Sequence, residues 1–258
     1  MTINAESFAQ NLTRENGLAL AKSYHVLANS SKLRSLLSYV APGKDFSTYS
    51  KYQLHQLINE SILSTFRGEA YIKQLLVKRF IEEDAVAAFE IKTGESRLDF
   101  LRINGASISY EIKSEIDSLR KLKHQVENYR NLFEYNYVVL DKIHLREARE
   151  ILPEKFGIME VVNEELRYRR QAQKNGRLNA ENQLSIFTKK ELHRYFKADK
   201  EKVLNAFPKS RINEVFKTML KDRYKARWQF LKEHQNSILP IDYQYFFQNN
   251  IPPSLIYR

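Results

Sequence analysis

The sequence contains no cysteine, which excludes disulfides, thiolate zinc sites and cysteine nucleophiles. It also has no apolar run long enough to span a bilayer, and its first residues, MTINAESFAQNL, have no signal-peptide core. The 6 histidines are scattered, and no pair has the spacing of a zinc motif. No glycine-rich loop that could cradle a phosphate is present, so nucleotide hydrolysis is not implied. These absences predict an unexported, cytoplasmic protein with no membrane partner.

Positive charge is in excess along the chain. The 42 Lys and Arg residues outnumber the 31 Asp and Glu residues, which gives a formal net charge of +11. A balance this basic favours polyanionic partners, nucleic acid first, although solubilising lysines are the plainer alternative. Hydrophobic residues make up 43% of the 258 positions, so global disorder is excluded and a sizeable core is expected.

The spacing of apolar residues changes along the chain and predicts an α+β fold. The middle of the sequence indicates a helix, a meander of three short strands, a second helix, and then two strands separated by a short helix. The turns of the meander are marked by Thr93-Gly94 and Asn104-Gly105. The predicted elements are helical regions over 4–40 and 48–83, strands at 86–94, 97–103 and 107–113, a helix over 114–133, a strand at 135–140, a helix near 144–151 and a strand at 157–162.

Four parts follow from this order. We expect a helical N-terminal extension over residues 1–50 and an α+β core over 51–163. Residues 164–182 are polar, basic and nearly free of apolar residues, which predicts a mobile linker. Residues 183–258 return to helical spacing and form a helical C-terminal region.

A short motif occurs twice in the predicted meander. An aromatic residue followed by Glu-Ile-Lys stands at Phe89–Lys92 and again at Tyr110–Lys113, with Asp99 between the two copies. Metal-dependent phosphodiester hydrolysis needs carboxylates that hold the metal and a cation near the attacking water. The second copy has an aspartate on the preceding strand and can meet both needs. Glu90 of the first copy has no such partner, and we expect it to border the site or to be solvated.

The hairpin loop decides whether Asp99 and Glu111 can cooperate. A strict two-residue loop would place Asp99 opposite Tyr110, with Glu111 on the other face of the sheet. A three-residue loop over 104–106, with a left-handed glycine, would place Asp99 opposite Glu111. The longer loop also sorts the side chains, and we therefore expect it. In this register Ile103 pairs with Ser107. One face of the hairpin is then apolar and consists of Leu98, Phe100, Ile108, Tyr110 and Ile112.

Asp99, Glu111-Ile112-Lys113 and a following helix with Gln125-Val-Glu-Asn-Tyr129 together resemble the PD-(D/E)XK nuclease superfamily, in its branch with a Gln-x-x-x-Tyr helix. The likeness covers about residues 65–163 and is closest to small bacterial and phage-associated members. It implies a restriction-endonuclease-like core, a mixed sheet flanked by helices. Leu98 stands where the proline of the motif would be.

The resemblance also implies roles for individual residues. Asp99 and Glu111 would be ligands of Mg²⁺ or Mn²⁺, joined by the backbone carbonyl of Ile112 and by Glu69 on the first helix. Lys113 would orient or activate the water. Two further residues of the motif, Gln125 and Tyr129, would lie beside the site. The alternatives are a surface ion pair for Glu111 and Lys113, a solvated Gln125 and simple core packing for Tyr129.

The flanking regions supply further basic residues. Arg167, Arg169, Arg170, Lys174 and Arg177 form a basic run that is either solvated or follows a phosphate backbone. We expect the C-terminal helices to form a positive wall of a substrate groove. The alternatives are that they cover an apolar side of the core or form the surface of a homodimer.

Three functions remain open at this point. The first is a Mg²⁺-dependent nuclease, acting most readily on DNA, with phage or mobile-element conflict as its setting. The second is an inactive nucleic-acid-binding protein on the same fold. The third is a regulatory interaction module whose basic surface meets an acidic protein. The intact set of Asp99, Glu111 and Lys113 favours the first.

Overall fold

The computed structural model describes residues 4–258 and divides into two compact units. The first unit joins residues 4–74 with Phe230–Arg258, and the second spans Leu75–Gln229. Two helices continue from one unit into the other, α5 (Glu69–Phe80) and α11 (Lys209–His234). None of the helices in this described part of the chain combines the length and hydrophobicity that a membrane span requires.

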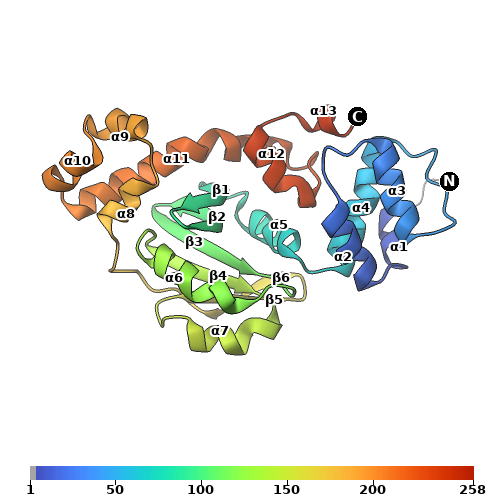
Figure 1. Ribbon diagram of the computed structural model, residues 1–258, viewed down its shortest axis with the longest axis horizontal. Helices are drawn as coiled ribbons and strands as arrows, with labels where there is room; N and C mark the ends of the chain where they lie inside the picture. The colour runs from blue at the N-terminus through green and yellow to red at the C-terminus, as the bar shows by residue number, and fades with distance from the viewer. Residues whose placement is uncertain (1–3) are drawn as a thin grey trace. The chain divides into compact units, whose positions relative to one another are not determined.

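The first unit is helical (Figure 1). Polar residues accept backbone N–H groups at the starts of its longer helices, and a common apolar cluster with Phe8, Leu37 and Ile58 holds the helices together. Its elements are α1 (Ala5–Ala9), α2 (Arg14–Ser23), α3 (Ser30–Val40), α4 (Lys51–Thr65), η3 (Pro240–Asp242), α12 (Tyr243–Asn249) and α13 (Pro253–Ile256).

A buried polar contact fastens the C-terminal segment within this unit. Tyr24 of α2 and Tyr257 both donate to Oδ2 of Asp242, at 2.9 and 2.8 Å. Nδ1 of His55 on α4 lies 2.7 Å from the same Tyr24 hydroxyl. Segments from the two ends of the chain therefore share one core.

The second unit contains a six-stranded mixed sheet whose spatial order follows the sequence. Strands β1 to β3 form an antiparallel meander, β4 and β5 continue parallel to β3, and β6 is antiparallel to β5. The strands are β1 (Val86–Thr93), β2 (Ser96–Asn104), β3 (Ala106–Lys113), β4 (Tyr135–Leu140), β5 (Gly157–Val162) and β6 (Glu165–Arg170). The predicted α+β class, with helices flanking a mixed sheet, is confirmed.

Helices cover both faces of this sheet. On one face, α6 (Leu122–Arg130) and α7 (Leu145–Ile151) pack on β4 and β5 through a cluster that includes Val126, Val138 and Ala148 (Figure 1). The short turns η1 (Leu119–Lys121) and η2 (Lys142–His144) precede them. On the other face, Phe80 of α5 and Trp228 of α11 contact the ring of Phe100. Side chains alternate along a strand, so Glu111 and Lys113 point to the α6 face.

Of the remaining helices, two contact α11 through Gln183 to Asn213 and Glu191 to Arg223, and the third packs on those two. They are α8 (Ala180–Ser185), α9 (Lys189–Phe196) and α10 (Lys200–Ala206). Phe216 of α11 contacts both Phe133 and Phe187, and Lys217 donates to the carbonyl of Gly105 at 2.9 Å. Within the second unit, α11 therefore covers an apolar side of the core through Phe216 and Trp228. The expectation that these helices line the Asp99–Lys113 face is wrong for α11.

Residues 164–182 do not form a linker throughout. β6 occupies their first half, because Leu166 is buried and Arg169 pairs with the buried carboxylate of Glu160 on β5. The boundaries of the compact units also differ from the predicted boundaries at residues 50 and 182. α4 belongs with the helices before it, because it shares their apolar cluster. The helix predicted over 114–133 begins later, because the side chain of Asp117 accepts the N–H and hydroxyl of Ser114 and forms a turn there.

Candidate active site

The hairpin between β2 and β3 sets the register of the site. Gly105 adopts a left-handed φ of 70°, and the strands pair around it with Ile103 opposite Ser107. The predicted three-residue loop is therefore confirmed. In this register Asp99 stands across from Glu111, and its Oδ2 accepts the N–H of Ile112 at 2.6 Å.

Four of the predicted site residues meet in one hydrogen-bonded network. The ammonium of Lys113 lies 2.8 Å from Oε1 of Glu111 and 3.0 Å from Oε1 of Gln125. Gln125 donates through Nε2 to Oε1 of Glu111 at 2.5 Å, and the Tyr129 hydroxyl donates to Oε2 at 2.7 Å. The four-residue spacing on α6 puts Gln125 and Tyr129 on one helix face, directly over β3. Gln125 is therefore bonded within the site, and Tyr129 packs in the core while also donating to Glu111.

Burial controls the protonation of this network. The Glu111 side chain is only 2% exposed, and burial raises the pKa of its carboxyl group. The Lys113 ammonium and the hydrogen bonds from Tyr129 and Gln125 act in the opposite direction. Burial also raises the pKa of the Tyr129 phenol, and the charge on Glu111 adds to the effect, so the phenol stays a proton donor at neutral pH. The three partners of Glu111 therefore favour its ionised form, against the effect of burial.

The backbone beside Asp99 is irregular. Phe89 pairs with Phe100 and Ile91 with Leu98, but Glu90 between them has a left-handed φ of 56°. For a residue other than glycine this conformation costs on the order of 1–3 kcal/mol, and the surrounding strand pairs must maintain it. The Glu90 carboxylate is paired with Arg97 at 2.5 Å. The register of the neighbouring pairs places Glu90 across from Asp99, so the two carboxylates stand on adjacent strands.

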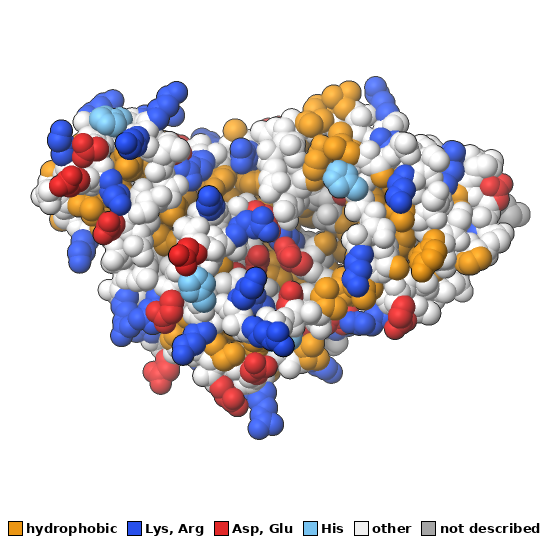
Figure 2. Space-filling view, viewed as in Figure 1, with side chains coloured by type: hydrophobic (Ala, Val, Ile, Leu, Met, Phe, Trp, Pro, Cys, Tyr) orange, Lys and Arg blue, Asp and Glu red, His pale blue; other side chains and the backbone are white. Residues whose placement is uncertain are grey.

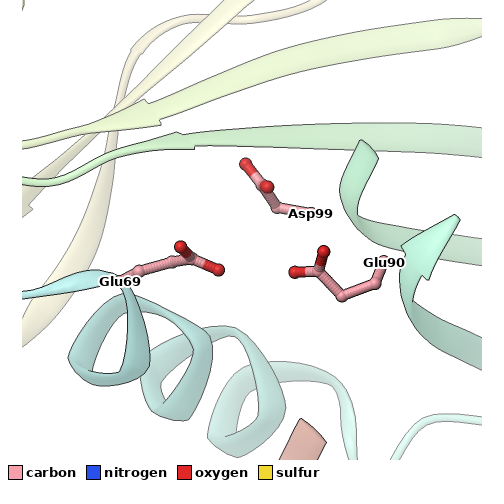
Figure 3. Close-up of side chains that lie close together, drawn as sticks. All are labelled: Glu69, Glu90 and Asp99. Atoms are coloured by element: carbon pink, nitrogen blue, oxygen red, sulfur yellow. The ribbon is translucent and has the colours of Figure 1, made fainter. Parts of the chain in front are cut away.

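Three carboxylates converge at this point. Figure 3 shows Glu69 from α5, Glu90 from β1 and Asp99 from β2 with their carboxylates turned toward one another. One oxygen from each lies within 4.8 Å of the others, and over residues 4–258 this is the group of acidic or histidine side chains that could hold a metal ion. Glu69 also forms an ion pair with Lys73, one turn along α5.

The predicted metal ligands are thus divided between two neighbouring groups. Asp99 and Glu69 are brought together, with Glu90 as the third carboxylate. Glu111 lies outside that group and is held instead by Lys113, Gln125 and Tyr129. The N–H of Ile112 is bound to Asp99, and the role of its carbonyl stays a prediction. Glu90 was expected to border the site or to be solvated, but the turn that pairs Thr93 with Ser96 also places Glu90 across from Asp99.

The basic run does not form a single surface. Arg169 pairs with Glu160, and Arg170 donates to the carbonyls of Phe156 and Pro153, at 2.6 Å and 3.0 Å. Arg167 lies 3.6 Å from Glu165 on the same strand. Arg169 and Arg170 therefore have structural partners, whereas Lys174 and Arg177 lie on the exposed segment after β6.

Comparison with known proteins identifies a family. A family model described as "Bacteriophage P4 protein cII" matches residues 64–246, more than half of the chain. No curated protein sequence matches. Among solved structures, the chain is similar to the "SPO1766 protein of unknown function from Silicibacter pomeroyi", with 17% identity, a TM-score of 0.34, and coverage of 54% of this chain and 90% of that one.

Proposed function

This chain belongs to the bacteriophage P4 protein cII family, and we propose that it is a divalent-metal-dependent nuclease on a PD-(D/E)XK-like core. The observation that carries the proposal is the set of contacts around Lys113. Its ammonium lies 2.8 Å from Glu111 and 3.0 Å from Gln125, while Asp99 on the adjoining strand is held against Ile112. The order of α5, the three-strand meander, α6 and β4 also agrees with that core.

The donor set fits a hard divalent cation. Glu69, Glu90 and Asp99 offer oxygen atoms only, which are the ligands that Mg²⁺ and Mn²⁺ take in proteins. Glu90 and Asp99 come from adjacent strands of one sheet, which fixes the positions from which these two carboxylates approach. A bound Mg²⁺ would supply positive charge to polarise a phosphate oxygen and lower the pKa of a water molecule.

The chain's own residues would position the substrate and the proton acceptor. Lys113 sits on a strand, its stem is buried, and its ammonium is fixed by two acceptors, so it can stabilise negative charge at a defined place. Gln125 bridges Lys113 and Glu111 and keeps both side chains oriented. The Tyr129 hydroxyl donates to Oε2, the other carboxylate oxygen of Glu111. These contacts support a preorganised site.

We propose DNA as the substrate class and phage or mobile-element conflict as the setting. The net charge of +11 favours a polyanion, and Figure 2 shows Lys and Arg side chains spread over the visible face. The family description names a bacteriophage protein, in agreement with that setting. Cleavage of RNA would give the same chemistry at the phosphate, and the choice of DNA rests on the resemblance alone.

One observation favours the second candidate, an inactive nucleic-acid-binding protein. Both oxygens of Glu111 are occupied by protein donors, and burial raises the pKa of its carboxyl group. A carboxyl group held in this way is a poorer metal ligand than a free carboxylate. This candidate predicts binding of nucleic acid without cleavage at any metal concentration.

The test is cleavage by the purified full chain. Supercoiled plasmid, linear duplex, single-stranded DNA and RNA are incubated with Mg²⁺, Mn²⁺ or EDTA. The proposal requires metal-dependent cutting that Asp99→Asn abolishes, because this change removes a charge while keeping an oxygen to accept from Ile112. Glu147→Gln, an exposed residue on α7, is the matched control and should cut normally.

The outcomes separate the candidates. Binding without cutting in every metal supports the inactive nucleic-acid-binding protein. Neither binding nor cutting supports an interaction module. Cutting that persists in EDTA, or in Asp99→Asn at the wild-type rate, would show that the carboxylate group does not carry the chemistry.

A further inference from the structure

A cavity at the amino ends of β4 and β5 lies outside the carboxylate site. Its volume is about 330 Å³, and it is bounded by residues from three separate parts of the second unit. Arg130 ends α6, Lys155 precedes β5, and Arg177 follows β6. Glu154 and the amides of Asn136 and Asn175 complete its polar lining. Three cations thus meet one carboxylate around a space of small-molecule size.

Asn175 holds two of the cation-bearing segments together. It is 8% exposed, and its amide nitrogen donates to the carbonyls of Arg130 and Phe133, the latter at 3.0 Å. Its amide oxygen accepts the N–H of Arg177 at 2.9 Å. A buried side chain with both polar atoms engaged fixes the backbone at Arg130 relative to the backbone at Arg177.

Arg170 fixes the third segment. Its guanidinium donates to the carbonyls of Phe156 and Pro153, which bracket Glu154 and Lys155 in the loop before β5. Burial and the nearby Arg149 lower the pKa of the Arg170 guanidinium, while Glu154 opposes the effect. The segments that bear Arg130, Lys155 and Arg177 are therefore each held by polar contacts from Asn175 or Arg170, as a preformed binding site requires.

The cations of the cavity keep donors for a ligand. Arg130 gives one nitrogen, Nη1, to Glu127 at 2.8 Å, and a guanidinium has five N–H donors in all. Over residues 4–258, the side chains of Lys155 and Arg177 form no ion pair. Fixed guanidinium and ammonium groups recognise phosphate through short, charge-assisted hydrogen bonds. The cavity admits a nucleotide-sized group but is too small for a duplex.

We propose that this cavity is a phosphate-binding site that takes a phosphate monoester, carried by a free nucleotide or by the end of a nucleic-acid strand. The site extends the proposed nucleic-acid function without depending on it, because binding here needs neither metal nor cleavage. A nucleic-acid strand end bound in this cavity would be recognised by its terminal phosphate. This recognition is separate from any contact of the strand with Lys113.

Binding is measured with the full chain in EDTA, so that cleavage plays no part. The probes are inorganic phosphate, adenosine 5′-monophosphate, and one short single-stranded DNA prepared with and without a 5′-phosphate. We expect Lys155→Ala and Arg177→Ala each to weaken binding of the phosphorylated probes by about ten- to a hundredfold, the effect of one charged hydrogen bond. Lys174→Ala is the matched control, because Lys174 is exposed on the same segment and does not line the cavity.

The probes also identify the source of the phosphate. Tighter binding of the 5′-phosphorylated strand than of the nucleotide assigns the site to strand ends, and equal binding assigns it to nucleotides. The proposal is overturned if none of the phosphorylated probes binds. It is also overturned if the two DNA strands bind equally, or if Lys174→Ala weakens binding as much as Arg177→Ala does. Circular dichroism of each variant confirms that it is folded.

Discussion

Replacing Lys113 with methionine tests the buried pair at the centre of the site. The side chains of Lys113 and Glu111 are 9% and 2% exposed, and their charged atoms lie 2.8 Å apart. Methionine fills similar space but leaves Glu111 with only Gln125 and Tyr129 as donors. Removing one partner of a buried ion pair costs about 3–5 kcal/mol, because the remaining charge is uncompensated. We expect Lys113→Met to lower the free energy of unfolding by that amount at neutral pH.

The pH dependence of this loss identifies its cause. Burial already raises the pKa of Glu111 above its ordinary value of 4.5, and loss of the ammonium raises it further. A carboxyl whose folded pKa is raised contributes stability that is present below the ordinary pKa and is lost as pH rises through the folded pKa. The deficit of Lys113→Met should therefore be smallest below the folded pKa of Glu111 in the wild type. Between that pKa and the higher folded pKa of the variant, it should grow by about 1.4 kcal/mol per pH unit.

The assay is urea unfolding of wild type, Lys113→Met, Glu111→Gln and the double variant, between about pH 5 and about pH 8. The double variant should recover most of the loss, since no charge is left unpaired. Lys123→Met is the control, because Lys123 is exposed on α6. If Lys113→Met were no more destabilising than Lys123→Met over this range, the Lys113–Glu111 pair would not be the buried contact described.

Three further predictions concern the rest of the fold. Burial raises the pKa of Asp242 to about 7, so the wild type should lose stability relative to Asp242→Asn as pH rises from about 5 to about 8, measured by hydrogen exchange in α2 and α4. Trp228 is 2% exposed against Phe100, so Trp228→Ala should cost about 3–5 kcal/mol in urea unfolding, and Trp228→Phe clearly less. Lys217→Met leaves Glu134 with fewer partners and should cost about 1–3 kcal/mol, measured by thermal unfolding; an effect no larger than that of the exposed Lys225→Met would refute it.

Local chemistry explains which parts of the site the sequence could predict. Gly105 permits the left-handed turn, and the turn sets the register that places Asp99 across from Glu111. The four-residue spacing of Gln125 and Tyr129 puts both on the helix face that meets β3. The hairpin register and the helix face each depend on residues close together in the sequence. The turn type determines the first, and the helical repeat determines the second.

The remaining features depend on contacts between distant residues. The first part of the basic run forms β6. Arg169 pairs there with Glu160 on β5, and the neighbouring Leu166 is buried in the core. Both interactions are made with residues outside the run. Strand spacing also gives no indication of the left-handed backbone at Glu90. The cavity at Arg130 joins three loops whose closeness only the tertiary fold establishes.

The central claim is tested most directly by the rate of Mg²⁺-dependent DNA cleavage in wild type and in Glu111→Gln. Glutamine has the same shape but keeps one acceptor oxygen, for either Lys113 or Tyr129, and circular dichroism checks that the variant is folded. The account predicts cleavage by the wild type and a loss of at least about a hundredfold in the variant, because the carboxylate that positions the Lys113 ammonium has been neutralised. Equal rates in the two proteins, or no cleavage by a folded and nucleic-acid-bound wild type, would contradict it.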